Sequence, residues 1–350
     1  MQKIKILFIL PFYGIGGTEK VAAKIMNHLT QLGFSVSVLT PTLNSPTEIH
    51  QLSLDSKINI IYLPQIFFWK RLLRARKIVK DLNPDIIEGM LNFGNILQGF
   101  VKIRSIKTIY NMRSVPKSFV KNPIVSLALK FAQVRSTVVL VNSPHLQKYV
   151  LMKDKYSLIL NPVPSIVGNF QIRNQIQSIN KVLTVSNLRS QKGLIPFLHL
   201  LKNLDSDLLR HFEFDIAGSG KLDSQLRQFI VANDLPVNLL GYVKNIENLY
   251  QQYSLYIHPS EKEGSPNALL EAIASSIPVA CQDAEYSRDL NISSRFRYSN
   301  ARQLEEILRL FLVDTLPFIQ EIKSLQKVIL KNTLENVVQN RIKLYKSLLK

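Results

Sequence analysis

Apolar residues along this chain fall into short continuous runs, and longer stretches with helical spacing separate the runs. Continuous runs, rather than a strict alternation of apolar and polar positions, are typical of parallel strands that are covered on both faces. The runs predict two series of strands, over residues 4–10, 35–40, 58–63, 85–89, 108–111 and 137–142, and then over 182–186, 213–217, 237–240, 255–259 and 278–282. Strands that alternate with helices in two series predict two doubly wound α/β domains.

The stretch 161–180 separates the two series and is rich in Pro, Asn and Gln, which predicts a linker. We therefore expect a first domain over 1–165, a linker over 166–180 and a second domain over 181–330, with the domains facing each other across a cleft. The last segment, 331–350, has helical spacing and could pack back on the first domain. No apolar window approaches the roughly 18 residues of a membrane-spanning helix.

The first predicted strand leads into the segment FYGIGGTEK at residues 12–20 and then into a helical pattern. Strand, glycine-rich turn and helix form the arrangement that holds a phosphate at many nucleotide sites. The glycines do not fit G-x-G-x-x-G, because Glu19 stands at the third required position and its carboxylate would repel a pyrophosphate. We expect Gly16 and Gly17 instead to let the loop approach a ligand closely.

Positive charge is concentrated in the first half of the chain. Of the net +19, residues 1–170 contribute 22 Lys and Arg against 7 Asp and Glu, whereas residues 171–350 carry 22 against 18. A basic half implies an anionic partner: nucleic acid, a membrane surface or a phosphorylated substrate. No helix-turn-helix, zinc finger or basic low-complexity tail is present, which argues against nucleic acid. The lone Cys281 excludes an internal disulfide framework, and we expect it to be buried and inert.

The most specific stretch reads PSEKEGSPNALLEAIASSIP over residues 259–278, with Glu263 and Glu271 eight positions apart. Ser265 is suited to cap a helix and Pro266 to its first turn. Backbone amides at such a helix start point at an anion, and Glu271 in the second turn can accept hydrogen bonds from vicinal hydroxyls. These features predict a nucleotide site. The alternative is an amphipathic helix with two solvated glutamates.

This stretch, with its E-G-S-P-N-A-L-L-E-A core, resembles the E-x7-E signature of the family 4 retaining glycosyltransferases, in its bacterial surface-polysaccharide subgroup. Segments 182–193 (VLTVSNLRSQKG) and 214–222 (FDIAGSGKL) resemble the family's loops in the second domain, and FYGIGGTEK its N-terminal glycine loop. The resemblance covers residues 4–283. It implies the GT-B fold, in which two Rossmann-like doubly wound domains face each other across a cleft.

The resemblance also assigns roles to residues. Glu271 should bind the donor ribose, Glu263 should contact the donor sugar near the reacting carbon, and Lys192 should neutralise the departing diphosphate. The residues expected at the donor are Gly16, Gly17, Asn187, Gly218, Gly264, Ser265, Pro266, Asn267, Ala268 and Glu271, and the catalytic residues expected are Glu263, Lys192, Arg189 and Arg113.

Two departures from the family pattern bear on these roles. Asn187 stands where an arginine is usual, and we expect Arg189 to replace it; the alternative is weaker stabilisation of the leaving group. The strand near 107–113 lacks the usual histidine and carries Asn111 and Arg113, and Arg113 could bind an anionic part of donor or acceptor. The motif Asp205-Ser-Asp207 mimics a metal-binding D-x-D but is expected to cap a helix.

The segment 66–82 (IFFWKRLLRARKIVKDL) combines aromatic with cationic residues and predicts docking at an anionic membrane surface. The residues expected to dock are Phe67, Phe68, Trp69, Lys70, Arg71 and Arg74. The alternative is a helix whose aromatics lie in the core and whose charges are solvated. Segment 114–134 adds further apolar positions and lysines.

We therefore expect a retaining glycosyltransferase that moves a hexose or N-acetylhexosamine from a nucleotide sugar, with UDP as the nucleotide, to a lipid-linked saccharide in bacterial surface-polysaccharide synthesis. Neither a cofactor nor a metal ion is expected, and the protein should be cytoplasmic and peripheral at the inner face of the membrane. Two alternatives remain open: a nucleotide-sugar 2-epimerase of the same fold, and a non-catalytic partner subunit.

Overall fold

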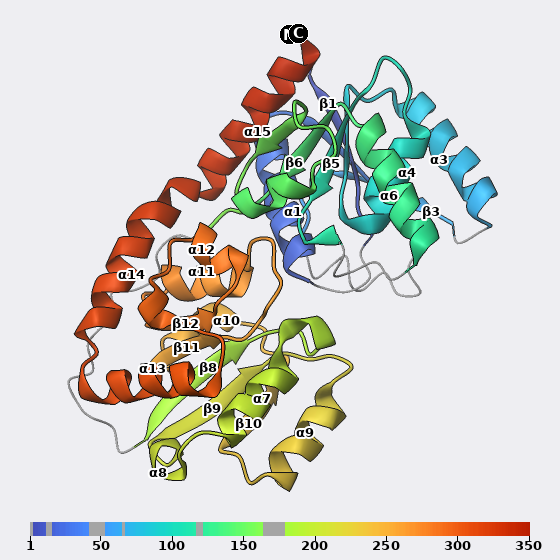
Figure 1. Cartoon of the computed structure of the whole chain (residues 1–350). Coiled ribbons are helices and arrows are strands. Elements are labelled where there is room, and N and C mark those ends of the chain that lie inside the picture. Colours follow the sequence, from blue (N-terminus) through green and yellow to red (C-terminus); the bar gives the residue numbers. More distant parts are fainter. Residues whose placement is uncertain (1–2, 12–15, 42–52, 65–66, 117–121, 164–178) are drawn as a thin grey trace. The chain divides into compact units, whose positions relative to one another are not determined.

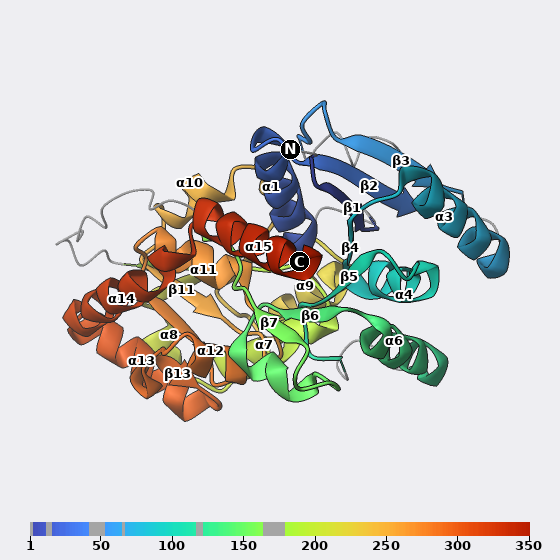
Figure 2. The same cartoon turned by 90° about the horizontal axis from the view of Figure 1, so that it is seen from above.

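The computed structural model describes residues 3–11, 16–41, 53–64, 67–116, 122–163 and 179–350. The chain divides into two compact units, one formed by residues 1–162 with 334–350 and the other by 163–333. Each unit consists of a parallel sheet with helices on its faces (Figures 1 and 2). Most of the predicted linker, together with residues 12–15 of the glycine loop, lies outside the described residues.

The sheet of the first unit has the strand order β3-β2-β1-β4-β5-β6-β7, with all pairs parallel. Its strands are β1 (Lys5–Ile9), β2 (Ser35–Pro41), β3 (Asn59–Leu63), β4 (Ile86–Gly89), β5 (Lys107–Met112), β6 (Val138–Val141) and β7 (Tyr156–Leu158). Its helices are α1 (Gly17–Gln31), α3 (Phe68–Leu82), α4 (Leu91–Val101), α6 (Pro123–Arg135), the 3-10 turn η1 (Pro144–Tyr149) and α15 (Leu334–Leu349).

The two faces of this sheet are covered by different helices because successive side chains of a strand point to opposite faces. Ile6 and Phe8 of β1 pack with α1 and α15, whereas Leu7 and Ile9 pack with α3 and α4. In both views α3, α4 and α6 lie on one side of the sheet and α1 and α15 on the other (Figures 1 and 2).

The C-terminal helix α15 belongs to the first unit and carries two side chains into its interior. The Arg341 guanidinium pairs with Glu88 at the end of β4 at 2.5 Å, and the Tyr345 hydroxyl donates to the other carboxylate oxygen of Glu88. Asn111 also donates to Glu88, at 3.2 Å. Glu88 is fully buried and Arg341 is 2% exposed. The last helix therefore neutralises a charge in the centre of the first sheet.

The sheet of the second unit has the order β10-β9-β8-β11-β12-β13 and is also parallel. Its strands are β8 (Asn180–Val185), β9 (Phe212–Ala217), β10 (Val237–Gly241), β11 (Leu255–His258), β12 (Val279–Gln282) and β13 (Arg297–Tyr298). Its helices are η2 (Ser190–Lys192), α7 (Leu194–Lys202), α8 (Ser206–Leu209), α9 (Asp223–Ala232), α10 (Ile246–Tyr250), α11 (Asn267–Ala274), α12 (Glu285–Asp289), η3 (Ser294–Phe296), α13 (Ala301–Val313), α14 (Leu316–Ile329) and η4 (Leu330–Asn332).

Two expectations about single residues are confirmed in this unit. The Asp205 carboxylate accepts a hydrogen bond from the Asp207 amide at 2.9 Å and caps α8, so the D-x-D motif is a cap. Cys281 is buried in β12, and burial raises the pKa of its thiol well above the ordinary value. In the part of the chain that the structure describes, no helix is long and apolar enough to cross a membrane.

Candidate active site

Three loops of the second unit meet where β8, β9 and β11 end. The carboxyl ends of parallel strands lie at one edge of a sheet, so the loops that follow them are neighbours. The loop after β8 is bound to the loop after β9: Ser186 N donates to Ala217 O at 3.0 Å, and Leu188 N to Ser219 O at 3.0 Å. Gly218 permits this approach, because a Cβ there would lie 1.8 Å from Ser186 O.

Gly193 brings the loop after β8 against the loop after β11. It has a φ of +68°, and a Cβ at this position would lie 2.1 Å from the Pro259 carbonyl oxygen. Two features therefore exclude a side chain at this position: the left-handed backbone conformation and the close approach of the Pro259 carbonyl oxygen. Next to this contact, Ser260 Oγ donates to Gln191 O at 3.4 Å. The turn places Lys192 beside the segment that carries Glu263.

Lys192 and Glu263, which are 71 positions apart in the chain, form an ion pair with 2.5 Å between Nζ and Oε1. The Glu263 side chain is 12% exposed and that of Lys192 30%. Burial raises the pKa of the Glu263 carboxyl, but Lys192 and His258 lower it more, so that it ends below its ordinary value. Glu263 is therefore ionised at neutral pH and acts as a hydrogen-bond acceptor rather than as an acid.

His258, at the end of β11, lies beneath this pair. Its Nδ1 is 3.0 Å from the Tyr256 hydroxyl, and its Nε2 is 3.8 Å from Glu263 Oε1. Burial lowers the pKa of His258 to about 4, so the ring is neutral at neutral pH. His258 is buried and its Nδ1 contacts the Tyr256 hydroxyl, which suits a structural role beside the ion pair.

The helix α11 begins later than the sequence predicts. Its N-cap is Pro266 and its first residue is Asn267, whereas we expected Ser265 as cap and Pro266 in the first turn. Pro266 has an extended ψ of 103°, and its carbonyl accepts the first helical bond from Leu270 N at 3.1 Å. The helix therefore lies in the stretch where the sequence predicts it. The backbone amides at its start, however, are those from Asn267 onward.

Glu271 lies on α11 and is held from one side by Tyr250. The Tyr250 hydroxyl is 3.2 Å from Glu271 Oε2 and 3.1 Å from the Ala268 carbonyl oxygen. Burial, followed by the charge of Glu271, raises the pKa of Tyr250 well above its ordinary value, so it remains a donor. Tyr250 was not identified from the sequence, because an internal tyrosine in a helical pattern gives no functional signal. Its hydroxyl fixes the orientation of one carboxylate oxygen of Glu271.

Asn187 and Arg189 both lie in the loop that leads to Lys192, and both are exposed. The Asn187 carbonyl accepts hydrogen bonds from Ser186 Oγ at 3.1 Å and from Arg189 N at 2.8 Å, which folds this loop into a tight turn. Arg189 therefore occupies the loop of Lys192. Its proposed replacement of the usual arginine stays a prediction.

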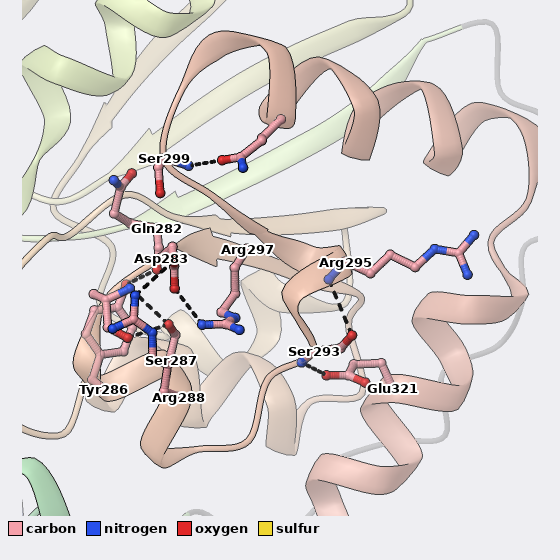
Figure 3. Close-up of polar contacts among 12 residues, drawn as sticks. Gln282, Asp283, Tyr286, Ser287, Arg288, Ser293, Arg295, Arg297, Ser299 and Glu321 are labelled. Carbon is pink, nitrogen blue, oxygen red and sulfur yellow. Dashed lines mark hydrogen bonds and ion pairs between the residues drawn. The ribbon is translucent and has the colours of Figure 1, made fainter.

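A network behind the site fixes the segment from which Glu263 projects. The Tyr286 hydroxyl donates to the Ser260 carbonyl at 2.8 Å, and Tyr286 is 1% exposed. Figure 3 shows its surroundings, in which Asp283 lies between Arg288 and Arg297. The Asp283 carboxylate pairs with Arg297 at 2.5 Å and with Arg288 at 3.0 Å. These contacts join α12 and β13 to β12 and anchor Tyr286.

The remaining predicted site residues lie in the first unit. Gly16 is the N-cap of α1, and a Cβ there would lie 2.6 Å from Glu19 Oε2, so the Glu19 side chain folds back over the helix start. Arg113, just after β5, donates from Nη2 to Asn161 Oδ1 at 2.8 Å. Burial, followed by the charge of Arg341, lowers the pKa of Arg113 to about 10, so it remains cationic. Among the described residues its Nε is buried without a hydrogen-bond partner.

The residues expected at a membrane lie on α3 and just before it. Phe67 is 84% exposed and Trp69 69% exposed, so these two aromatics are outside the core. Lys70 and Arg74 are exposed, whereas Arg71 is half-buried and donates from Nε to the Pro64 carbonyl at 3.2 Å. Phe68 begins the helix, and its side chain lies outside the described residues.

Comparison with known proteins matches both units to families. The family model described as "Glycosyltransferase Family 4" matches residues 15–164, and the one described as "Glycosyl transferases group 1" matches residues 169–315. An uncharacterized glycosyltransferase of Haemophilus influenzae is 26% identical over 294 residues, which cover 80% of each chain. The Campylobacter jejuni enzyme named GalNAc-alpha-(1->4)-GalNAc-alpha-(1->3)-diNAcBac-PP-undecaprenol alpha-1,4-N-acetyl-D-galactosaminyltransferase is 22% identical over 284 residues, 77% of each chain.

The same fold is also found in a solved structure. Anabaena HepE in complex with UDP and glucose superposes with a TM-score of 0.82 at 16% identity, over 98% of this chain and 100% of that one. The two parallel sheets, the two family matches and these relatives agree with one another. The chain therefore belongs to the family 4 type of GT-B glycosyltransferases.

Proposed function

We propose that this glycosyltransferase is retaining and that its donor is a UDP-sugar. It would move a hexose or N-acetylhexosamine from this donor to a lipid-linked saccharide in bacterial surface-polysaccharide synthesis. The observation that carries the proposal is the Lys192–Glu263 ion pair, which joins the loop after β8 to the segment before α11. A cation, an ionised carboxylate and a helix start in one loop cluster suit a ligand that combines a diphosphate with a sugar.

The donor would be held through its charge and its hydroxyls. Its diphosphate would take the Lys192 ammonium as a partner and lie near the first amides of α11, while Glu271 would accept hydrogen bonds from the ribose. A departing nucleoside diphosphate gains negative charge in the transition state, and an ammonium with a helix dipole stabilises that charge. For this reason we propose that the reaction needs no metal ion.

Retention would result if the acceptor oxygen attacked the anomeric carbon from the same face as that from which the leaving group departs. The bond between the anomeric carbon and the phosphate oxygen breaks, and the acceptor oxygen bonds to that carbon on the same face. The acceptor proton goes to an oxygen of the departing phosphate. Glu263, whose pKa is held below the ordinary value, stays ionised and would accept hydrogen bonds from the sugar hydroxyls.

Two relatives support the choice of donor and acceptor. The Campylobacter jejuni relative is named for transfer of N-acetylgalactosamine to a saccharide on undecaprenyl diphosphate, and Anabaena HepE was crystallised with UDP and glucose. The exposed Phe67 and Trp69, with the cations of α3, support a peripheral position on an anionic membrane. A lipid-linked acceptor would be presented at such a surface.

A panel of UDP-sugars tests the reaction. Slow release of UDP, accelerated by a membrane extract that supplies acceptor, is the expected result. An isomerised sugar would identify an epimerase, and neither product would identify a non-catalytic subunit. Transfer should persist in excess EDTA; complete loss that a divalent metal restores would refute the metal-independent mechanism.

The ribose contact is tested with Glu271→Gln, and Glu261→Gln serves as the control because Glu261 is exposed. A hydrogen bond to a charged group contributes about 1.5–3 kcal/mol, so UDP affinity should fall by about 10–100-fold in the Glu271 variant. The control should bind UDP as the parent protein does. Unchanged UDP affinity in the Glu271 variant, measured by calorimetry, would remove the proposed role.

A further inference from the structure

The first unit contains a pocket of about 710 Å³ at the amino ends of β5, β6 and β7. Arg113 and Asn111 lie at the opposite ends of these strands, so the pocket is separate from the predicted site residues of this unit. Five cationic residues line it, and no acidic residue does: Lys102, Arg104, Lys107, Arg135 and Lys155. No carboxylate lines the pocket to balance these charges, which favours the binding of an anion.

The charges in the pocket repel one another. Burial, together with Arg135, Lys155 and Lys107, lowers the pKa of Lys102. Lys102 donates to the Arg135 carbonyl at 2.7 Å and Arg135 donates to the Gly99 carbonyl at 3.0 Å, so both cations are fixed by neutral carbonyl groups. In the described part of the chain, none of the five forms an ion pair with a carboxylate. A bound anion would remove this repulsion.

An exposed apolar stripe on α6 leads to the pocket. Residues three or four apart lie on one face of a helix. On α6 this face carries Ile124, Leu127, Phe131 and Val134, which are 75%, 68%, 42% and 49% exposed. Val134 also lines the pocket, and Arg135 lies 5.3 Å from the centre of the Phe131 ring. The apolar stripe and the basic pocket therefore form one continuous surface.

We propose that this surface binds an anionic phospholipid of the bilayer, with the phosphate of its head group in the basic pocket and its acyl region along the α6 stripe. An amphipathic helix with its apolar face at the acyl boundary and cations at the phosphate level is the arrangement that anionic membranes attract. The charge complementarity and the continuity at Val134 select a lipid over a small soluble anion. The inference extends the proposed membrane association and does not depend on the proposed reaction.

The test is flotation of the full chain with phosphatidylcholine vesicles, with and without phosphatidylglycerol. The variant Arg104→Gln/Lys155→Gln removes two exposed cations that make no side-chain hydrogen bond or ion pair among the described residues, so it should fold normally. Lys202→Gln/Lys323→Gln removes the same charge from exposed positions of the second unit and is the matched control. Circular dichroism checks the fold of both.

The parent protein should bind only the vesicles that contain phosphatidylglycerol. Each cation near such a surface contributes a factor of about five, so the pocket variant should bind about 20–30-fold more weakly and the control within about twofold of the parent. Leu127→Ser should also weaken binding. Equal binding of the pocket variant and the control would overturn the proposal. If Trp69→Ser then lowered binding, the protein would dock through α3 and not through the pocket. Binding of glycerol phosphate without binding of vesicles would overturn it too and identify a soluble ligand.

Discussion

Removing the Lys192 ammonium should destabilise the second unit in a manner that depends on pH. In Lys192→Met the Glu263 carboxylate, 12% exposed, keeps its burial and loses its cation. His258 cannot replace that cation, because burial lowers the pKa of its ring to about 4. Burial is then opposed mainly by the hydrogen bond from Ser260, and the pKa of this carboxyl should rise.

The size of the effect follows from the contact that is lost. A hydrogen bond between charged groups contributes about 1.5–3 kcal/mol. The second unit spans residues 163–333, and for a unit of such a length 1 kcal/mol shifts the Tm by about 2–4 °C. The Tm of Lys192→Met should therefore fall by about 3–12 °C at pH 7.5.

The pH dependence has a definite sign. The folded pKa of Glu263 lies below its unfolded value, so the pair stabilises the fold fully above the unfolded pKa, and this contribution is lost as pH falls through the folded pKa. The Tm difference between variant and parent should thus shrink between about pH 5 and pH 4.

Differential scanning calorimetry from about pH 7.5 to about pH 3.5 measures this difference. Glu263→Gln/Lys192→Met completes a double-mutant cycle, and its loss of Tm should be smaller than the sum of the two single losses. A Tm difference that is the same at every pH, or additive losses in the cycle, would refute the reasoning.

The remaining predictions concern backbone conformation and a buried charge. Gly193→Ala should lower the free energy of unfolding by well over 1 kcal/mol, because a Cβ would lie 2.1 Å from the Pro259 carbonyl oxygen. Gly241→Ala is its control: the φ of +71° is similar but the space is open, so about 1 kcal/mol is expected, and equal losses in urea would show that the contact is unimportant. Arg341→Met should cost about 3–5 kcal/mol, because Glu88 stays buried without its cation. Glu88→Gln/Arg341→Met should recover part of this loss in urea unfolding, and no recovery would contradict the charge argument.

The long buried strands could be read from the sequence, but two short strands could not. The run predicted at 4–10 is β1 (Lys5–Ile9), and the other continuous apolar runs also became strands of the two sheets. β7 (Tyr156–Leu158) and β13 (Arg297–Tyr298) have three and two residues, and β7 is largely exposed at the sheet edge. Segments this short carry no detectable period, because their pairing is determined by the neighbouring strand.

In the candidate site, the sequence predicted the residues that belong to local motifs but not the contacts between residues that are far apart in the chain. Glu263, Glu271 and Lys192 could be selected because the motifs that carry them are local. Their arrangement could not, because the ion pair of Lys192 with Glu263 depends on a backbone approach at Gly193 between segments far apart in sequence. The start of α11 was predicted one residue too early, because proline is favoured at the first helical position, whereas Pro266 is the N-cap here.

The position of α15 in the first unit has a consequence for synthesis on the ribosome. Arg341 follows Glu88 by 253 residues, which take about 10–50 s to translate at about 5–20 residues per second. Throughout this interval the nascent first unit lacks both the cation for its central carboxylate and the helix that covers one face of its sheet. The second unit, whose residues are made before α15, can close its core earlier. The domain that is translated first is therefore expected to complete its folding last.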